Sequence, residues 1–153
     1  MSSPLSYSSI GKARDGSPIP LAGSLSFHSR YNPLREAEQF AASYGKSGQE
    51  APDFFIVPGL CGGYHIEALL KRFPGVEIVA IENSPEDIGF LSAIPCVSRL
   101  TENRHVHITS TDTLQTLLPQ VFFPAEHSHL QIAPLRAWEQ CFPDSAKKAA
   151  DGS

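Results

Sequence analysis

Two short apolar runs, residues 54–57 and 76–81, constrain the fold of this 153-residue chain more than any other feature. The first is uninterrupted, the second is broken only by Glu77, and a helical apolar pattern follows each. Strands of this kind are typical of a parallel sheet that helices cover on both faces. A third, alternating segment lies at residues 105–109. The order strand, helix, strand, helix, strand therefore predicts a small Rossmann-like three-layer α/β sandwich with a mostly parallel sheet. Residues 130–133 are a candidate fourth strand.

The N-terminal part has a different pattern. Residues 5–21 predict a β-hairpin, because Asp15 and Gly16 form a turn signal between two extended arms. Pro18 and Pro20 restrict the second arm to an edge strand or an extended segment.

Domain boundaries follow from these signals. Asn32 and Pro33 are typical of the first residues of a helix. We therefore expect residues 1–31 to form a β-hairpin or extended segment packed on the core. Residues 32–143 would form the Rossmann-like domain, and residues 144–153 a flexible tail.

Composition excludes several classes of protein. Twelve Lys and Arg against sixteen Asp and Glu give a net charge of −4, which argues against a nucleic-acid partner. No apolar run approaches the roughly 18 residues of a membrane-spanning helix, and residues 1–10 lack the pattern of a secretory signal. The cysteines are three and far apart, which argues against a disulfide framework. We expect a cytoplasmic protein with neither a membrane nor a nucleic-acid partner.

Three or four strands are few for a sheet of this type. Either the chain belongs to a longer protein, or the hairpin completes the sheet, or another chain covers a sheet edge. The last possibility predicts a homo-oligomer that forms through an open sheet edge.

A glycine-rich stretch, residues 58–63, joins the first buried strand to its helix; we call it the glycine turn. Small residues allow a ligand to approach the backbone, and a helix N-terminus offers amide donors to an anion. An acid that ends the next strand lies where ribose hydroxyls are usually bound. The turn therefore predicts a nucleotide or nucleoside cofactor held by Gly59, Cys61, Gly62, Gly63, Glu82 and Asn83. The alternative is that the glycines only make a tight turn and Glu82 is a solvated acid at the strand end.

Other reactive side chains give weaker signals. His105 with His107, and His127 with His129, are two pairs that together suit a metal site, but no Cys or acid spacing supports one and we predict none. Cys61 stands at a helix start, where thiol pKa values fall. We interpret Cys61 as a small residue that is tolerated in a glycine position, in preference to a nucleophile.

The segment before the first predicted helix is also distinctive. His28, Ser29, Arg30 and Tyr31 directly precede the capping Asn32. These side chains either contact a ligand or anchor the loop to the sheet. A carboxylate on the following helix, Glu36, is expected to pair with Arg30 or Arg35.

Three stretches, HSRYNPLREAEQF, FFIVPGLCGGYHIEALLKRFP and VEIVAIENSPE, resemble the N-terminal domain of the motility-associated factor family. These proteins are bacterial flagellin glycosyltransferases with a central domain similar to 6-hydroxymethylpterin pyrophosphokinase. The positions that match the family pattern are His28, Ser29, Tyr31, Pro33, Glu36, Ala37, Gly59, Gly63, Tyr64, His65 and Glu82. The chain departs from the pattern at Asn32, where the family has Asp, and at Cys61 and Gly62, where it has Gly and Leu.

The resemblance implies a Rossmann-like accessory domain. In the family, transfer of a nonulosonic acid from a CMP-activated donor to flagellin Ser or Thr is attributed to the central domain. That domain lies outside this sequence, so no catalytic residue carries over. The resemblance further implies that the partners are other domains of a longer glycosyltransferase or flagellin, and that the ligand is a nucleotide or CMP-sugar contacted by residues such as His65.

Two further functions are open from the residues. The strand, glycine turn, strand and Glu82 also suit an S-adenosylmethionine-dependent methyltransferase-like domain. The third reading is a structural interaction module that docks another chain through its sheet edge.

Overall fold

A computed structural model describes residues 5–152 of the chain. Two sheets and seven helices make up this part. The strands are β1 (Ser9–Lys12), β2 (Pro18–Ala22), β3 (Leu25–Ser26), β4 (Phe54–Pro58), β5 (Glu77–Glu82), β6 (Val106–Ser110) and β7 (Leu130–Ile132). The helices are α1 (Pro33–Ala42), α2 (Tyr64–Arg72), α3 (Pro85–Leu91), α4 (Pro95–Thr101), α5 (Leu114–Val121), α6 (Arg136–Cys141) and α7 (Pro143–Gly152).

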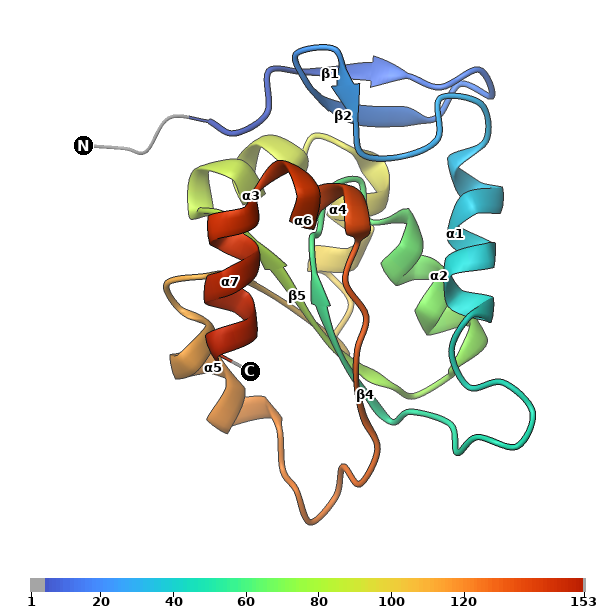
Figure 1. Cartoon of the computed structure of the whole chain (residues 1–153), viewed down its shortest axis with the longest axis vertical. Helices are drawn as coiled ribbons and strands as arrows, with labels where there is room; N and C mark the ends of the chain where they lie inside the picture. The colour runs from blue at the N-terminus through green and yellow to red at the C-terminus, as the bar shows by residue number, and fades with distance from the viewer. Residues whose placement is uncertain (1–4, 153) are drawn as a thin grey trace.

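The larger sheet has the strand order β6-β5-β4-β7, and all of its pairings are parallel. Helices α1 and α2 lie on one side of it, and α5 and α7 lie on the other (Figure 1). The predicted Rossmann-like α/β sandwich is therefore confirmed, and so is the fourth strand. Chain order reverses at β4, since β5 follows it on one side and β7 on the other.

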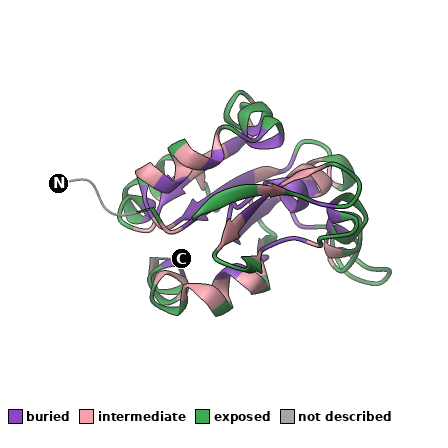
Figure 2. Cartoon of the chain, turned by 90° about the horizontal axis from the view of Figure 1, so that it is seen from above, coloured by how far each residue is buried: buried purple, intermediate pink, exposed green. Residues whose placement is uncertain are grey.

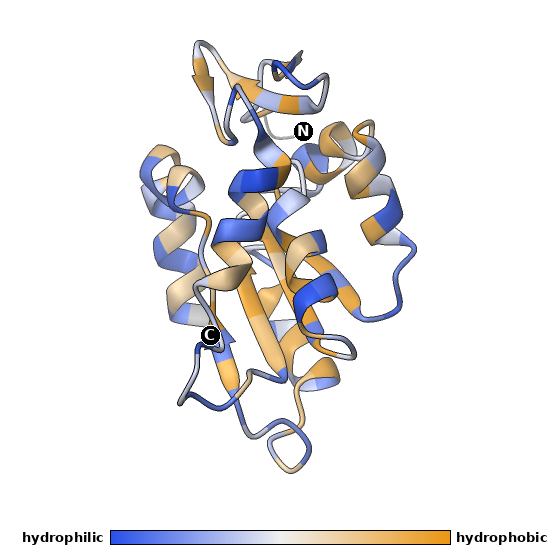
Figure 3. Cartoon of the chain, turned by 90° about the vertical axis from the view of Figure 1, so that its right-hand side faces the viewer, coloured by the Kyte–Doolittle hydropathy of each residue, from blue (hydrophilic) through white to orange (hydrophobic). Residues whose placement is uncertain are grey.

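The two central strands carry the core. Phe54, Phe55, Ile56 and Val57 are at most 2% exposed, and the apolar residues of β5 from Ile78 onward are fully buried. Figures 2 and 3 show these strands as the buried, hydrophobic centre of the molecule. Burial of one such side chain is worth about 1.5–3 kcal/mol. The apolar runs at residues 54–57 and 76–81 therefore correctly predicted the two central strands.

The N-terminal segment forms a three-stranded antiparallel sheet, β1-β2-β3, in place of a simple hairpin. The very short β3 pairs only with Leu21 and Ala22 of β2. The prediction of an edge strand for the second arm is wrong, because β2 is the middle strand of this sheet. Pro18 and Pro20 are tolerated there because β3 is too short to reach them, so they pair only with β1. Figure 1 shows β1 and β2 lying across one end of the molecule. The Tyr64 hydroxyl at the start of α2 donates to the Pro18 carbonyl at 2.6 Å, so this is the end at which β4 finishes.

Two of the predicted helix starts are confirmed by their caps. The Asn32 Oδ1 accepts from the Arg35 amide at 3.0 Å, and the Ser84 Oγ accepts from the Asp87 amide at 3.2 Å. Such caps stabilise a helix by about 1 kcal/mol. No helix within residues 5–152 is long and apolar enough to cross a membrane.

The flexible tail expected at residues 144–153 is wrong for the part that the structure describes. Helix α7 spans Pro143–Gly152, and its Ala149 is fully buried. Pro143 suits the first position of a helix, and Ala146 and Ala149 lie three residues apart on the face that packs on the core. Small alanines gave too weak an apolar pattern to predict this packing. Helices α4 and α6, seven and six residues long, were likewise missed because they are short.

Candidate functional site

The glycine turn lies at the carboxyl end of β4, where chain order in the sheet reverses. Gly59 and Gly63 have positive φ angles of 103° and 80°. A Cβ on Gly59 would lie 2.9 Å from the Trp138 Cβ, and one on Gly63 would lie 2.6 Å from Leu100 Cδ1. Both glycines are therefore required by backbone conformation and by the close approach of α6 and α4. Packing within the chain accounts for them without a ligand.

Cys61 is the residue of the turn that departs most from the family pattern. Its φ of 46° is the left-handed conformation that favours glycine. Its side chain is fully buried, with the Tyr7 hydroxyl 3.3 Å from its Sγ. Burial, with Glu82 nearby, raises the pKa of the Cys61 thiol well above its ordinary value. The idea of a nucleophilic Cys61 is wrong, because the thiol stays protonated and inaccessible.

Thiol reactivity tests this placement. Cys61 and Cys96 are buried, while Cys141 is only partly so. Burial raises the pKa of Cys96 to about 12. We expect a thiol reagent to modify one of the three cysteines in the native protein and all three after unfolding in urea. A Cys141→Ser variant that still reacts quickly when native would contradict the buried turn.

The amide donors of Cys61, Gly62 and Gly63 in the turn are used inside the protein. The Cys61 amide donates to Glu82 Oε1 at 3.0 Å, and the Gly62 amide donates to His28 Nε2 at 2.9 Å. The Gly63 amide donates to the Leu60 carbonyl at 2.9 Å. A helix N-terminus binds an anion through unpaired amides. In this conformation these three amides are not available to an anion.

Glu82 is fully buried and accepts four hydrogen bonds. The Tyr7 hydroxyl and the Cys61 amide donate to its Oε1, at 2.6 and 3.0 Å. The Asn83 amide and the Trp138 indole donate to its Oε2, at 3.0 and 3.1 Å. Burial raises the pKa of Glu82, and the four donors oppose that rise. The alternative of a solvated acid is wrong, since Glu82 joins the N-terminal segment, the glycine turn and α6.

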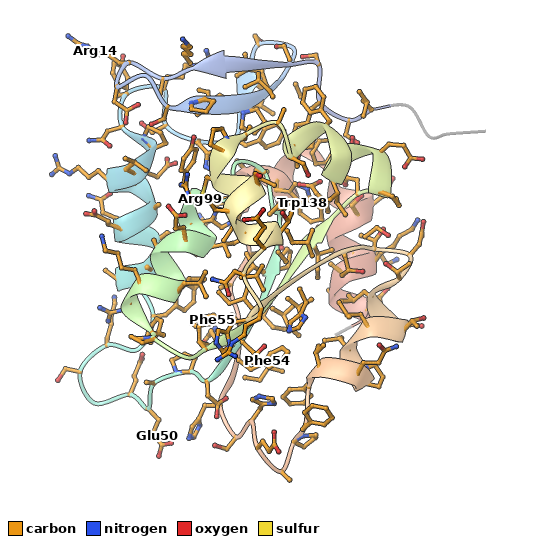
Figure 4. All side chains as sticks on the ribbon, turned by 180° about the vertical axis from the view of Figure 1, so that it is seen from behind. Arg14, Glu50, Phe54, Phe55, Arg99 and Trp138 are labelled. Atoms are coloured by element: carbon orange, nitrogen blue, oxygen red, sulfur yellow. The ribbon has the colours of Figure 1, made fainter. Side chains whose placement is uncertain are left out.

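The one tryptophan of the chain, Trp138, stands at the centre of this cluster. In Figure 4 it lies toward the end of the molecule that carries the N-terminal sheet, whereas Phe54 and Phe55 lie toward the other end. No sequence pattern indicated Trp138 as a site residue, because α6 follows Glu82 by more than fifty residues. Only the return of β7 beside β4 places α6 on the glycine turn.

Two histidines are buried beside the turn. His28 and His65 are 5% and 1% exposed, with ring centroids 5.7 Å apart. Burial lowers the pKa of His28 to about 3 and that of His65 to about 4. Both rings are therefore neutral at physiological pH. Neutral His28 accepts the Gly62 amide, and His65 Nε2 donates to the Gly59 carbonyl at 2.8 Å.

The rest of the 28–31 segment supports the anchoring interpretation. The Ser29 Oγ accepts from the Tyr31 and Asn32 amides, both at 3.1 Å, and Arg30 donates to the Ser24 carbonyl. Tyr31 itself is 71% exposed, away from the glycine turn. The expected pairing of Glu36 with Arg30 or Arg35 is not observed among the described residues; Glu36 Oε1 accepts from the Ser29 amide at 2.9 Å.

Asn83 differs from the other predicted site residues. Its side-chain Oδ1 and Nδ2 are buried and have no hydrogen-bond partner among residues 5–152. An unsatisfied buried polar group costs about 1–3 kcal/mol. Asn83 also borders an open, polar cavity of about 490 Å³ at the carboxyl ends of β5 and β6. Of the predicted cofactor-binding residues, Asn83 is the one whose side chain still has unused hydrogen-bond donors and an unused acceptor.

The histidine pairs are not brought together. His105 Nδ1 and His107 Nε2 each hydrogen-bond to Glu77, at 2.7 and 2.9 Å. His127 Nδ1 accepts from the Phe123 amide, and His129 pairs with Glu50. In the described part of the chain, no group of three or more His, Cys, Asp or Glu side chains is arranged to hold a metal ion.

The chain has only weak similarity to known proteins. No protein-family model matches the chain, and no curated protein does. Among solved structures, the plantazolicin methyltransferase BamL, in complex with a triazolic desmethylPZN analog and SAH, is 16% identical with a TM-score of 0.35 over 54% of this chain and 29% of that one. The plantazolicin methyltransferase BpumL, in complex with a monoazolic desmethylPZN analog and SAH, is 17% identical with a TM-score of 0.33 over 77% of this chain and 66% of that one. The chain therefore spans less than two thirds of either methyltransferase.

Proposed function

We propose that this chain is a non-catalytic accessory domain of a flagellin-modifying glycosyltransferase of the motility-associated factor type. The observation that carries the proposal is the hydrogen bond from the Gly62 amide to His28 Nε2, at 2.9 Å. It joins the two sequence segments on which the resemblance rests. Their unusual residues thus serve one structural unit, as expected of a family signature that specifies a fold.

The same unit supports the non-catalytic part of the proposal. Glu82, His28 and the turn amides bond to one another and are buried. A general acid or base must reach its substrate within hydrogen-bond distance. In the glycine turn, each of these groups faces the protein interior.

The sheet edge at β7 supports a binding role. Leu130 and Ile132 are 41% and 45% exposed on this edge strand. Leu130 lines an apolar cavity of about 520 Å³ together with residues that include Phe122 and Phe123. Exposed apolar surface on an open edge is typical of a contact with another chain or domain. We propose that the catalytic domain of the transferase docks at this edge.

Mass spectrometry of flagellin tests the proposed role directly, because each transferred sugar adds a defined mass. The purified chain, given flagellin and a CMP-activated nonulosonic acid, is expected to transfer no sugar. Disruption of its gene is expected to remove the nonulosonic acid mass increment from flagellin. An Ile132→Glu variant should reproduce that loss, whereas Leu25→Glu, equally exposed on the N-terminal sheet, should not. Unchanged flagellin after gene disruption would refute the proposal.

A methyltransferase-like domain that binds S-adenosylmethionine is the second candidate. The observation in its favour is the topology, because the glycine turn lies at β4, where chain order reverses and where ligands of open α/β sheets bind. The occupied amides and the buried Glu82 argue against it. We expect no change in thermal midpoint with S-adenosylmethionine or S-adenosylhomocysteine at millimolar concentration. Saturation at 100 times a micromolar Kd would stabilise the protein by about 2.7 kcal/mol, so a rise of several degrees would favour the methyltransferase.

A further inference from the structure

The cavity beside Asn83 is a ligand site of a different kind from the one expected at the glycine turn. Its walls come from four separate parts of the chain: the N-terminal segment, the β5–α3 loop, the β6–α5 loop and helix α7. The lining side chains are mostly polar and include Ser6, Asn83, Ser84, Thr111, Asp112 and Lys148. The cavity lies at the carboxyl ends of β5 and β6, the rim at which parallel sheets bind ligands.

The side-chain amide of Asn83, distinct from the backbone N–H that donates to Glu82, is the second, independent observation. It has one acceptor and two donor hydrogens in a residue that lines the cavity, and none of them is bonded within residues 5–152. The neighbouring Glu82 has no such capacity, because all four of its hydrogen bonds are made inside the core. A ligand that bonds the Asn83 amide would relieve an unsatisfied buried group, and that relief favours binding.

The charges around the cavity select the class of ligand. Lys148 lies 4.0 Å from Asp112, so its charge is partly balanced, and Glu86 adds a second carboxylate to the lining. This balance disfavours a phosphate or carboxylate ligand. Hydroxyl groups suit it, since each can donate to a carboxylate and accept from an amide or a serine hydroxyl.

We propose that this cavity binds a neutral, polyhydroxylated ring through Asn83 and Asp112. The shared chemistry is a pair of adjacent hydroxyl groups, which either the ribose of a nucleoside or a free hexose supplies. This site is separate from the glycine turn, and it does not depend on the accessory role proposed above.

The fluorescence of Trp138 is expected to report ligand binding in the cavity. The Trp138 indole and the backbone N–H of Asn83 both donate to Glu82 Oε2, so a ligand that bonds the Asn83 side chain should alter the emission of this single tryptophan. Titration calorimetry would use adenosine, cytidine, their 2′-deoxy counterparts and methyl hexosides. We expect a Kd between about 10 µM and 1 mM for one class. Binding that needs the 2′-hydroxyl identifies ribose, and binding of the hexosides alone identifies a sugar.

Variants separate a binding role from a structural one. Asn83→Ala and Asp112→Asn should each weaken binding by about 5- to 10-fold or more, whereas Glu38→Gln, an exposed change on α1, should not. Asn83→Ala should also raise the thermal midpoint of the free protein by about 2–4 °C, because it removes an unsatisfied buried amide. No binding of any probe at 10 mM, on the order of ten times the weakest Kd expected, overturns the proposal. Binding that both variants leave unchanged overturns it too.

Discussion

Replacing Glu82 by Gln or Ala is expected to lower the free energy of unfolding by several kcal/mol. In Glu82→Ala, the Tyr7 hydroxyl, the Trp138 indole and two amides lose their acceptor inside the core. Removing one side of a buried charged network costs about 3–5 kcal/mol, which is a large part of the 5–15 kcal/mol that holds a typical domain together. We therefore expect a fall of about 10 °C in the thermal midpoint.

Glu82→Gln tests the same network with almost no change in volume. A carboxylate can accept from four donors, but the amide of Gln turns one of its two ends into a donor, which then faces two other donors. The expected loss is about 2–3 kcal/mol, measured by urea unfolding followed through Trp138 fluorescence. The matched control is Glu102→Gln, an exposed acid at the end of α4, which should change stability by less than about 0.5 kcal/mol. Equal stabilities of Glu82→Gln and the control would show that Glu82 is not the acceptor described here.

The second large effect is acid sensitivity that originates in His28 and His65. The pKa of His28 is about 3 and that of His65 about 4 in the folded protein, both lowered by burial from about 6.5. Below pH 6.5 the unfolded chain therefore binds protons that the folded chain does not. The stability that these neutral rings contribute is complete above pH 6.5 and is lost as pH falls toward 4 and 3. Between pH 7.5 and pH 5 each histidine should cost about 2 kcal/mol.

Two carboxyl groups also titrate in the acid range. Burial raises the pKa of Glu82, so its contribution is present below its ordinary pKa and decreases as pH rises, which opposes the histidines. Hydrogen bonds from His105 and His107 lower the pKa of Glu77, so its contribution is lost as pH falls. The difference between wild type and histidine variants isolates the histidines from both.

His28→Gln and His65→Gln each keep a suitable hydrogen-bonding group, since Gln can accept the Gly62 amide or donate to the Gly59 carbonyl. Each variant should lose about half of the dependence of stability on pH between 7.5 and 5, as measured by urea unfolding. His129→Gln, on the exposed loop before β7, serves as the control and should keep the dependence. If His65→Gln alone folds, its slope is sufficient for the test. An unchanged slope in that variant would contradict a neutral buried His65.

Much of the fold follows from local sequence. The apolar runs of β4 and β5 predict strands covered on both faces, and Asn32 and Ser84 predict helix starts through their capping oxygens. These features depend on residues a few positions apart, which is why they can be predicted. Helix α7 could not be predicted in this way. Its alanines bury little apolar area, and they bury it only because α5 and α6 lie beside the helix in the folded protein.

The candidate site divides in the same way. The sequence by itself determined that Gly59, Gly63 and Glu82 would meet at the carboxyl ends of two parallel strands, since strand order and crossover handedness require it. Only the tertiary structure decided what those residues bond to. Tyr7 and His28 lie directly before and after the N-terminal sheet, and Trp138 comes from beyond the last strand. Hydrogen bonds between segments so far apart are set by the packing of whole elements, and no local pattern specifies them. That packing fills the expected ligand site with the chain's own side chains and leaves Asn83 beside an open cavity.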